Sequence, residues 1–141
     1  VQPEAATGEA SIRGLHLLLA EDNELNAEIA ARLLNDEGAT VQVVRDGQQA
    51  IDAFASRPQG TYDAILMDIM MPKIDGYTAT RVIRSTNRQD AKTIPIIAMT
   101  AHVFDEDVKQ CLEAGMNAHL PKPLQMEKVV STIARLCKRK K

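Results

Sequence analysis

Short apolar runs alternate with longer amphipathic segments along most of this chain. The runs consist mainly of Leu, Ile, Val, Ala and Met with few interruptions, which is typical of strands that are covered on both faces of a sheet. We therefore predict strands at residues 15–20, 39–44, 62–67, 94–100 and 118–120.

The segments between these runs have the spacing of helices. In the first of them, Leu25, Ile29 and Leu33 fall on one helical stripe, and further along the chain Asp75 is placed to cap a helix. Helices are expected at about 23–38, 47–54, 76–84, 105–115 and 124–137. Strict alternation of five strands with five helices predicts an α/β fold with a parallel sheet and helices on both faces.

One folded domain accounts for most of the 141 residues. Residues 1–13 lack apolar periodicity and carry Pro, Gly, Ser and Thr, so they are predicted to form a linker or tail. The folded unit is expected at residues 14–138, followed by a basic tail at 139–141. A start at Val1 behind such a linker favours a piece cut from a longer protein.

The composition indicates a globular protein and argues against two kinds of partner. Hydrophobic residues make up 45% and charged residues 26%, and the net charge of −2 lacks the basic surplus of nucleic-acid-binding proteins. The apolar runs are far too short to span a membrane, and we expect no signal peptide ahead of the first predicted strand. Cys111 and Cys137 lack the spacing of metal ligands or a redox pair, so we expect reduced thiols in a cytoplasmic protein.

Polar residues interrupt the apolar pattern where the predicted strands end. Glu21 and Asp22 follow the first strand, Asp68 follows the third, Thr100 ends the fourth, and Lys122 lies just beyond the fifth. The carboxyl ends of parallel strands meet at one edge of the sheet, which is where ligands bind in open α/β folds. Three carboxylates, a hydroxyl and an ammonium group should therefore lie close together.

This set of groups has a chemical use. Closely packed carboxylates raise one another's pKa unless a cation lies between them, and ligands that are all oxygen point to Mg²⁺. Together with a lysine and a hydroxyl, such an ion would stabilise a phosphoryl group during its transfer. One carboxylate could then act as nucleophile and form an acyl phosphate, and Asp68 is the candidate because it is the middle of the three acidic strand ends.

Four motifs make the chain similar to a known family. They read LLLAEDNELN, ILMDIMMPKIDG, IIAMTA and HLPKP, and they occur in this order within residues 14–138. The chain thereby resembles the receiver domain of response regulators, which act in two-component signalling. The resemblance implies a flavodoxin-like (βα)5 three-layer sandwich of strand order 2-1-3-4-5, and transfer of a phosphoryl group from a phosphohistidine to an aspartate.

The resemblance also implies roles for the acids, carried over by their positions in the motifs. Asp68 would be the phosphoacceptor, Asp22 and Asp68 would bind Mg²⁺ directly, and Glu21 would act through water. The backbone carbonyl of Met70 would be a further metal ligand. Mn²⁺ could replace Mg²⁺ in such a site.

Three further residues would complete the phosphoryl site and its switch. By resemblance, Thr100 would hydrogen-bond a phosphoryl oxygen and Lys122 would pair with the phosphoryl group. His119 stands where the family usually has Tyr or Phe, whose ring moves inward together with the threonine. We hypothesise that an imidazole at this position weakens the switch or couples it to pH.

Details of the motifs look most like the receiver module of a hybrid sensor histidine kinase, and the alternative is a stand-alone single-domain response regulator. The resemblance implies a histidine kinase or a histidine phosphotransfer domain as partner, which would contact Asn23, Leu25, Asn26 and Pro123. The domain would catalyse its own phosphorylation and dephosphorylation, and a full-length parent could be a membrane-bound kinase, a transferase. We expect a monomer or weak dimer that itself contacts neither membrane nor nucleic acid.

Other functions use similar parts. Hydrolases of the aspartyl-phosphate type need a second acid two residues after the nucleophile, where this chain has Met70. Pseudo-receivers, which act only by binding partners, typically lack the acceptor, the acidic pair or the lysine, and all of these are present here. Flavin- and dinucleotide-binding folds have a glycine-rich phosphate loop after the first strand, and this chain has none.

Overall fold

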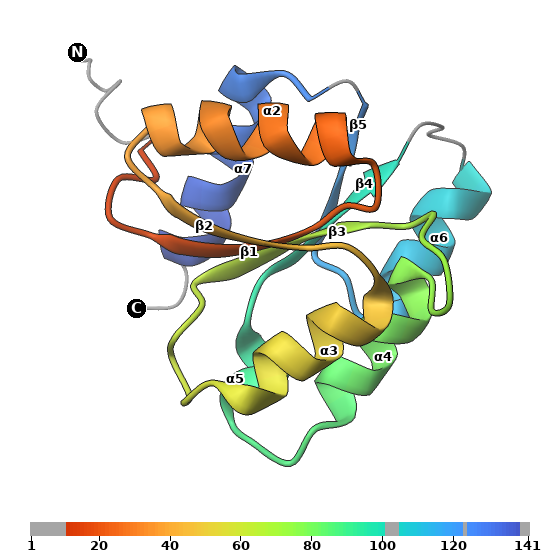
Figure 1. Ribbon diagram of the computed structural model, residues 1–141. Helices are drawn as coiled ribbons and strands as arrows, with labels where there is room; N and C mark the ends of the chain where they lie inside the picture. The colour runs from red at the N-terminus through yellow and green to blue at the C-terminus, as the bar shows by residue number, and fades with distance from the viewer. Residues whose placement is uncertain (1–10, 101–104, 123, 139–141) are drawn as a thin grey trace.

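A five-stranded parallel sheet forms the centre of the protein in a computed structural model, which describes residues 11–100, 105–122 and 124–138. The strands are β1 (His16–Ala20), β2 (Thr40–Val44), β3 (Ala64–Asp68), β4 (Ile96–Thr100) and β5 (Ala118–Pro121). Their order in the sheet is β2-β1-β3-β4-β5, and each neighbouring pair is parallel. The predicted α/β fold and its strand order are confirmed (Figure 1).

Helices cover both faces of this sheet. They are α2 (Glu24–Asp36), α3 (Gly47–Ser56), α4 (Gly76–Ser85), α5 (Asp90–Thr93), α6 (Asp105–Ala114) and α7 (Met126–Lys138). Figure 1 shows α2 and α7 on one face and α3, α4, α5 and α6 on the other, which makes the three expected layers. The pattern of the sequence did not predict the short α5 between α4 and β4.

Side chains of the strands alternate between the two faces and so build two separate cores. Leu17, Leu19 and Leu66 pack with residues of α2 and α7 on one face. Leu18 and Ile65 pack with residues of α3 and α4 on the other. Because successive residues of a strand point to opposite faces, a sheet that is covered on both sides needs apolar residues at every position. This is why β3 is buried along its whole length.

Helix α2 packs on the core with only some of its apolar side chains. Ala27, Ala30 and Leu34 are buried against the core. The α2 stripe (Leu25, Ile29 and Leu33) faces solvent, and Leu25 is 64% exposed.

The start of α4 is packed tightly against the end of β3. Asp75 caps the helix, as predicted, by accepting a hydrogen bond from the backbone N–H of Thr78. Gly76 follows, and a Cβ at this position would lie 2.4 Å from the carbonyl oxygen of Asp68. Only glycine permits so close an approach, so the loop from β3 to α4 is fixed at both ends.

The packed part of the chain begins ahead of β1. Ile12, which lies within the expected linker of residues 1–13, is buried in the core between α2 and α7. Residues 1–10 and 139–141 are outside the described residues. Across the described part, we find no helix with the length and apolar character needed to cross a membrane.

Candidate functional site

Three carboxylates lie together at the carboxyl-terminal edge of the sheet. Glu21 and Asp22 follow β1, Asp68 is the last residue of β3, and these two strands are neighbours. Each side chain offers one oxygen that lies within 4.8 Å of the other two. Glu21 and Asp68 are buried, whereas Asp22 is exposed. The convergence of acids that the sequence predicts is therefore present, and we call these three residues the acidic cluster.

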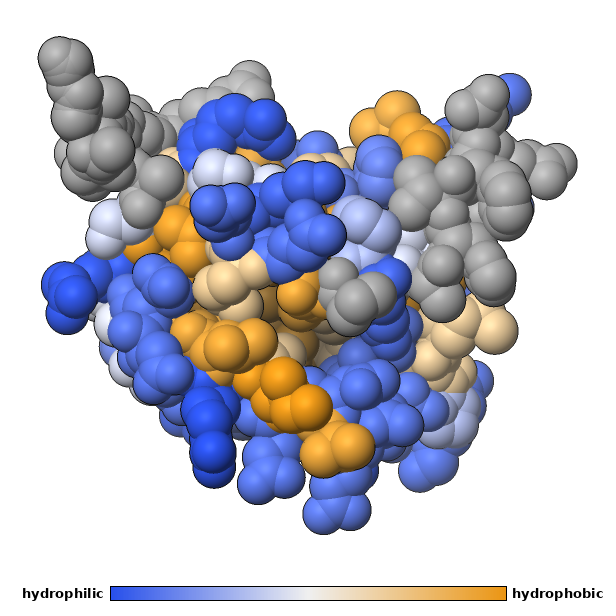
Figure 2. All heavy atoms as spheres, turned by 90° about the horizontal axis from the view of Figure 1, so that it is seen from above, coloured by the Kyte–Doolittle hydropathy of each residue, from blue (hydrophilic) through white to orange (hydrophobic). Residues whose placement is uncertain are grey.

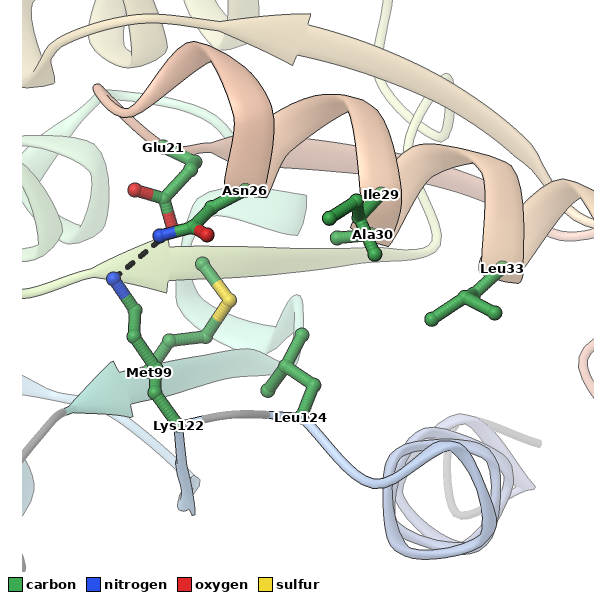
Figure 3. Close-up of a pocket in the computed structure, with 8 residues that line it drawn as sticks. All are labelled: Glu21, Asn26, Ile29, Ala30, Leu33, Met99, Lys122 and Leu124. Atoms are coloured by element: carbon green, nitrogen blue, oxygen red, sulfur yellow. Dashed lines mark ion pairs between the residues drawn. The ribbon is translucent and has the colours of Figure 1, made fainter.

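Lys122 reaches the acidic cluster from the end of β5. Its Nζ lies 2.9 Å from Oδ2 of Asp68 and 3.0 Å from Oε1 of Glu21. Figure 3 shows the ion pair with Glu21. The backbone N–H of Lys122 donates to the carbonyl oxygen of Thr100, which holds the residue beside β4. One ammonium group with several donors can bridge two carboxylates in this way.

Backbone N–H groups orient the two buried carboxylates. The N–H of Asn23 donates to Oε2 of Glu21 at 3.1 Å, and the N–H of Met70 donates to Oδ1 of Asp68 at 3.3 Å. The side chain of Asn23 in turn caps α2 by accepting from the N–H of Asn26. Each buried carboxylate thus has one oxygen on a backbone donor and the other on Lys122, which fixes its orientation.

The charges of the site are not balanced. Burial raises the pKa of Asp68 to about 6; the hydrogen bond from Lys122 lowers this pKa, and the charge of Glu21 raises it again. Burial alone would lower the pKa of Lys122, but its hydrogen bonds to Asp68 and Glu21 outweigh that effect and raise it. Two of the three carboxylates therefore share the ammonium group of Lys122, and a further cation would relieve the mutual repulsion of all three.

The chemistry of the acidic cluster fits a hard divalent cation. Its side chains offer only oxygen, which is the ligand atom that Mg²⁺ prefers. The exposed Asp22 leaves the cluster open to solvent, as an ion that keeps several water ligands requires. Among the side chains that the structure describes, no other group of three or more His, Cys, Asp or Glu residues is close enough to hold a metal ion.

The two expected switch residues lie on neighbouring strands but in different surroundings. Thr100 ends β4 and is almost buried, one residue beyond Met99, the sheet partner of Asp68. His119 lies on β5 and lines a separate cavity of about 330 Å³ between α6 and α7, together with Arg135. The structure thus places Thr100 at the acidic edge and His119 in another pocket.

An apolar cavity of about 90 Å³ opens beside the acidic cluster, and sequence reasoning missed it. Figure 3 shows Glu21 and Lys122 at one end and apolar side chains of α2, β4 and the segment after β5 along the rest. The lining consists of Glu21, Asn26, Ile29, Ala30, Leu33, Met99, Lys122 and Leu124. The α2 stripe is the feature of the sequence that could have indicated this cavity, because two of its residues, Ile29 and Leu33, line it.

Three of the four expected partner contacts lie at the start of α2. Leu25 and Asn26 are exposed on the first turn of α2, while Pro123 is outside the described residues. Asn23 is also exposed, but its side chain is engaged in capping the helix. Figure 2, which views the molecule from the α2 side, shows a band of hydrophobic side chains among polar ones.

Comparison with known proteins places these features in a family. The sequence matches the response regulator receiver domain family over residues 17–134. Histidine kinase 1 of Arabidopsis thaliana is 38% identical over an alignment that includes 92% of this chain and 13% of that protein. Transcription factor SKN7 of Saccharomyces cerevisiae is also 38% identical, over 96% of this chain and 21% of that protein.

A solved structure is similar over almost its whole length. It is the receiver domain of a sensor histidine kinase from Pseudomonas aeruginosa, crystallised with a magnesium ion coordinated in the active-site cleft. The TM-score is 0.79 and the identity 38%, over 89% of this chain and 98% of that one. By contrast, the chain spans only about an eighth to a fifth of the two full-length relatives. The family match covers most of the chain, so the chain belongs to the response regulator receiver domain family.

Proposed function

We propose that Asp68 of this domain receives a phosphoryl group from a phosphohistidine of a histidine kinase or a histidine phosphotransfer domain. One observation carries the proposal: Asp68 is a buried carboxylate at the end of β3, with one oxygen on Lys122 and the other on a backbone N–H. The magnesium ion in the active-site cleft of the similar Pseudomonas domain supports it.

The transfer breaks one bond and forms another. An oxygen of the Asp68 carboxylate attacks the phosphorus, the P–N bond to the imidazole breaks, and its electron pair returns to the imidazole nitrogen, which takes up a proton. Lys122 then pairs with the phosphoryl oxygens, and the hydroxyl of Thr100 donates to one of them. Thr100 and His119, on neighbouring strands, are the proposed switch residues.

The metal ligands that we propose are Asp22, Asp68 and the backbone carbonyl of Met70, with Glu21 acting through water. Mg²⁺ suits this set of oxygens, and Mn²⁺ would suit it as well. When bound, the ion offsets the negative charge that the carboxylates and a phosphoryl group bring together. The chain itself contributes the orientation of the carboxylates, through the backbone N–H groups and Lys122.

We propose that the partner docks on the α2 stripe and the cavity beside it. The stripe is apolar and exposed, and Asn26 lies between it and the acidic cluster. An amphipathic helix that carries a phosphohistidine would cover the stripe and present its imidazole to Asp68. Pro123 remains a proposed contact, whereas Asn23 would contribute through its backbone because its side chain caps α2.

The parent protein is proposed to be a hybrid sensor histidine kinase, which the similarity to two histidine kinases supports. A stand-alone response regulator is the alternative. In either case we propose that the domain acts in the cytoplasm as a monomer or weak dimer and binds no nucleic acid. A membrane anchor, where the parent has one, would lie in another part of that protein.

The test of the phosphoacceptor is intact-mass measurement after incubation with Mg²⁺ and phosphoramidate. The wild-type chain should gain the mass of one phosphoryl group, and Asp68→Asn should gain none, because the amide cannot form the acyl phosphate. Asp52→Asn is the matched control, since it removes an exposed carboxylate on α3. Its gain in mass should equal that of the wild type.

Three results would contradict the proposal. A wild-type chain that neither gains mass nor binds Mg²⁺ would be a pseudo-receiver that acts only by binding a partner. Continued release of phosphate from the donor, beyond one turnover per chain, would favour a hydrolase. A gain in mass that survives in Asp68→Asn would move the acceptor to another residue.

A further inference from the structure

The corner between β2 and α3 (residues 44–47) contacts the loop that carries Glu21 and Asp22. The carbonyl oxygen of Val44 accepts a hydrogen bond from the backbone N–H of Glu21 at 3.0 Å. Nη2 of Arg45 donates to the backbone carbonyl oxygen of Asp22 at 3.3 Å. A main-chain bond and a side-chain bond thus link this β2–α3 corner to two members of the acidic cluster.

The β2–α3 corner also packs against the loop that follows Asp68. A Cβ at Gly47 would lie 2.3 Å from the carbonyl oxygen of Ile74, so α3 begins in direct contact with that loop. Lys73, in the same loop, pairs with the side chain of Asp46 at 3.7 Å. The corner therefore supports both loops that hold the carboxylates.

Arg45 has a fixed backbone, and its side chain reaches Asp22, a proposed metal ligand whose carboxylate accepts no hydrogen bond from the described residues. Its N–H donates to Oε1 of Gln49 at 2.8 Å, and the adjacent Asp46 caps α3, so the backbone of Arg45 is tied into the first helical turn. Asp22 is exposed, and its carboxylate receives no hydrogen bond from the described residues, unlike those of Glu21 and Asp68. The position of Asp22 therefore depends on its backbone, which Arg45 holds.

We propose that Arg45 is a positioning residue for the divalent-cation site and acts through the backbone carbonyl of Asp22. This inference rests on the proposed function, because it needs Mg²⁺ to bind at the acidic cluster. A guanidinium group near the cluster has two opposite effects on that binding. Its charge repels the cation and weakens binding, whereas its hydrogen bond holds the Asp22 loop in place and strengthens binding.

We expect positioning to outweigh repulsion in this case. The hydrogen bond to Asp22 is direct, while the repulsion from an exposed guanidinium is screened by water and salt. The two effects predict opposite results when the charge is removed. A substitution of Arg45 therefore distinguishes them by sign and not only by size.

The experiment is an Mg²⁺ titration of the whole chain without phosphodonor. Binding is measured by calorimetry and by changes in the backbone amide NMR signals of residues 21–23. Arg45→Gln should weaken Mg²⁺ binding by roughly tenfold. At saturating Mg²⁺, its rate of phosphorylation by phosphoramidate should return to that of the wild type. Lys73→Gln is the matched control: it removes a cation that pairs with the β2–α3 corner but has no contact with the Asp22 loop, and its Mg²⁺ affinity should be equal or slightly higher.

The possible results separate the positioning role of Arg45 from the proposed metal site. Wild-type affinity or tighter binding in Arg45→Gln would show that charge dominates and would overturn the positioning role, while phosphorylation of Asp68 would stand. An equal loss of affinity in Lys73→Gln would also overturn it, because the effect would not depend on the bond to Asp22. A wild-type chain that binds no Mg²⁺ would overturn both this inference and the proposed metal site.

Discussion

Two ionic clusters in this molecule are built from similar groups but differ in charge balance. In the acidic cluster, Lys122 pairs with two of the three carboxylates, those of Glu21 and Asp68. Near α5, the guanidinium of Arg88 meets the single carboxylate of Asp90 through two bonds of 2.8 and 3.0 Å. Arg88 also donates to the carbonyl oxygens of Phe54 and Arg57, and the N–H of Gly60 completes the shell of Asp90.

The pKa values of the two aspartates record this difference. Burial and the neighbouring Glu21 raise the pKa of Asp68 to about 6 in spite of Lys122. The hydrogen bond from Arg88 lowers the pKa of Asp90, and this outweighs the effect of burial. A cluster with matched charges is closed and serves the fold, whereas a cluster with surplus negative charge is poised to take up a cation. Charge balance therefore separates the structural cluster from the functional one.

The largest expected effect is on how the free energy of unfolding changes with pH when no metal is bound to the acidic cluster. An acid whose folded pKa is raised binds protons more readily in the folded than in the unfolded state, so stability falls as pH rises between the two pKa values. From about pH 4 to about pH 7, the free energy of unfolding of the wild type should fall by roughly 2 to 3 kcal/mol relative to Asp68→Asn. Urea unfolding in the presence of EDTA measures this difference.

The control for that measurement is again Asp52→Asn, whose carboxylate is exposed on α3. Its stability relative to the wild type should change little over the same pH range. Parallel pH profiles for the wild type and Asp68→Asn would show that the pKa of Asp68 is not raised in the folded state. The two clusters would then not differ in charge balance. Addition of Mg²⁺ should stabilise the wild type more than Asp68→Asn, because the ion binds the folded state.

The second effect is the loss of the closed cluster in Arg88→Met. Arg88 and Asp90 have side chains that are only 13% and 17% exposed, so the variant leaves a carboxylate and two carbonyl groups poorly solvated. Methionine can still cover the ring of Phe54, which the guanidinium now contacts at 4.5 Å. We expect a loss of about 2 kcal/mol in the free energy of unfolding, with unchanged phosphorylation of the folded chain. Equal free energies of unfolding for Arg88→Met and for the control Arg57→Met would contradict a stabilising role of the Arg88 cluster.

The acidic cluster could be predicted from the sequence, and the Arg88 cluster could not. Glu21, Asp22 and Asp68 each interrupt an apolar run, and the parallel topology brings strand ends to one edge, so pattern and fold together were sufficient. Arg88 gives no such signal, because it lies in a polar segment and its acceptors, Phe54 and Arg57, are more than thirty residues away. Contacts of this kind depend on how loops meet, which periodicity does not describe.

The same distinction applies to helices. Residue spacing predicted α2 and α4 and the cap at Asp75, since these depend on local sequence. It did not show that the α2 stripe faces solvent, because an apolar stripe has the same pattern whether it meets the core or a partner. The structure shows which side of the helix meets the core, because Ala27, Ala30 and Leu34 are its buried residues.

The smallest expected effect concerns Asp90 and has the opposite dependence on pH from that of Asp68. A carboxylate whose folded pKa is lowered stabilises the fold above its unfolded pKa, and this contribution disappears as pH falls through the folded value. Asp90→Asn should therefore cost about 1 kcal/mol at neutral pH, and the cost should shrink below about pH 4. Urea unfolding across this range measures it. A cost that grows on acidification would mean that Asp90 is not held as an ion by Arg88, and the two clusters would then no longer differ in the way their charges are balanced.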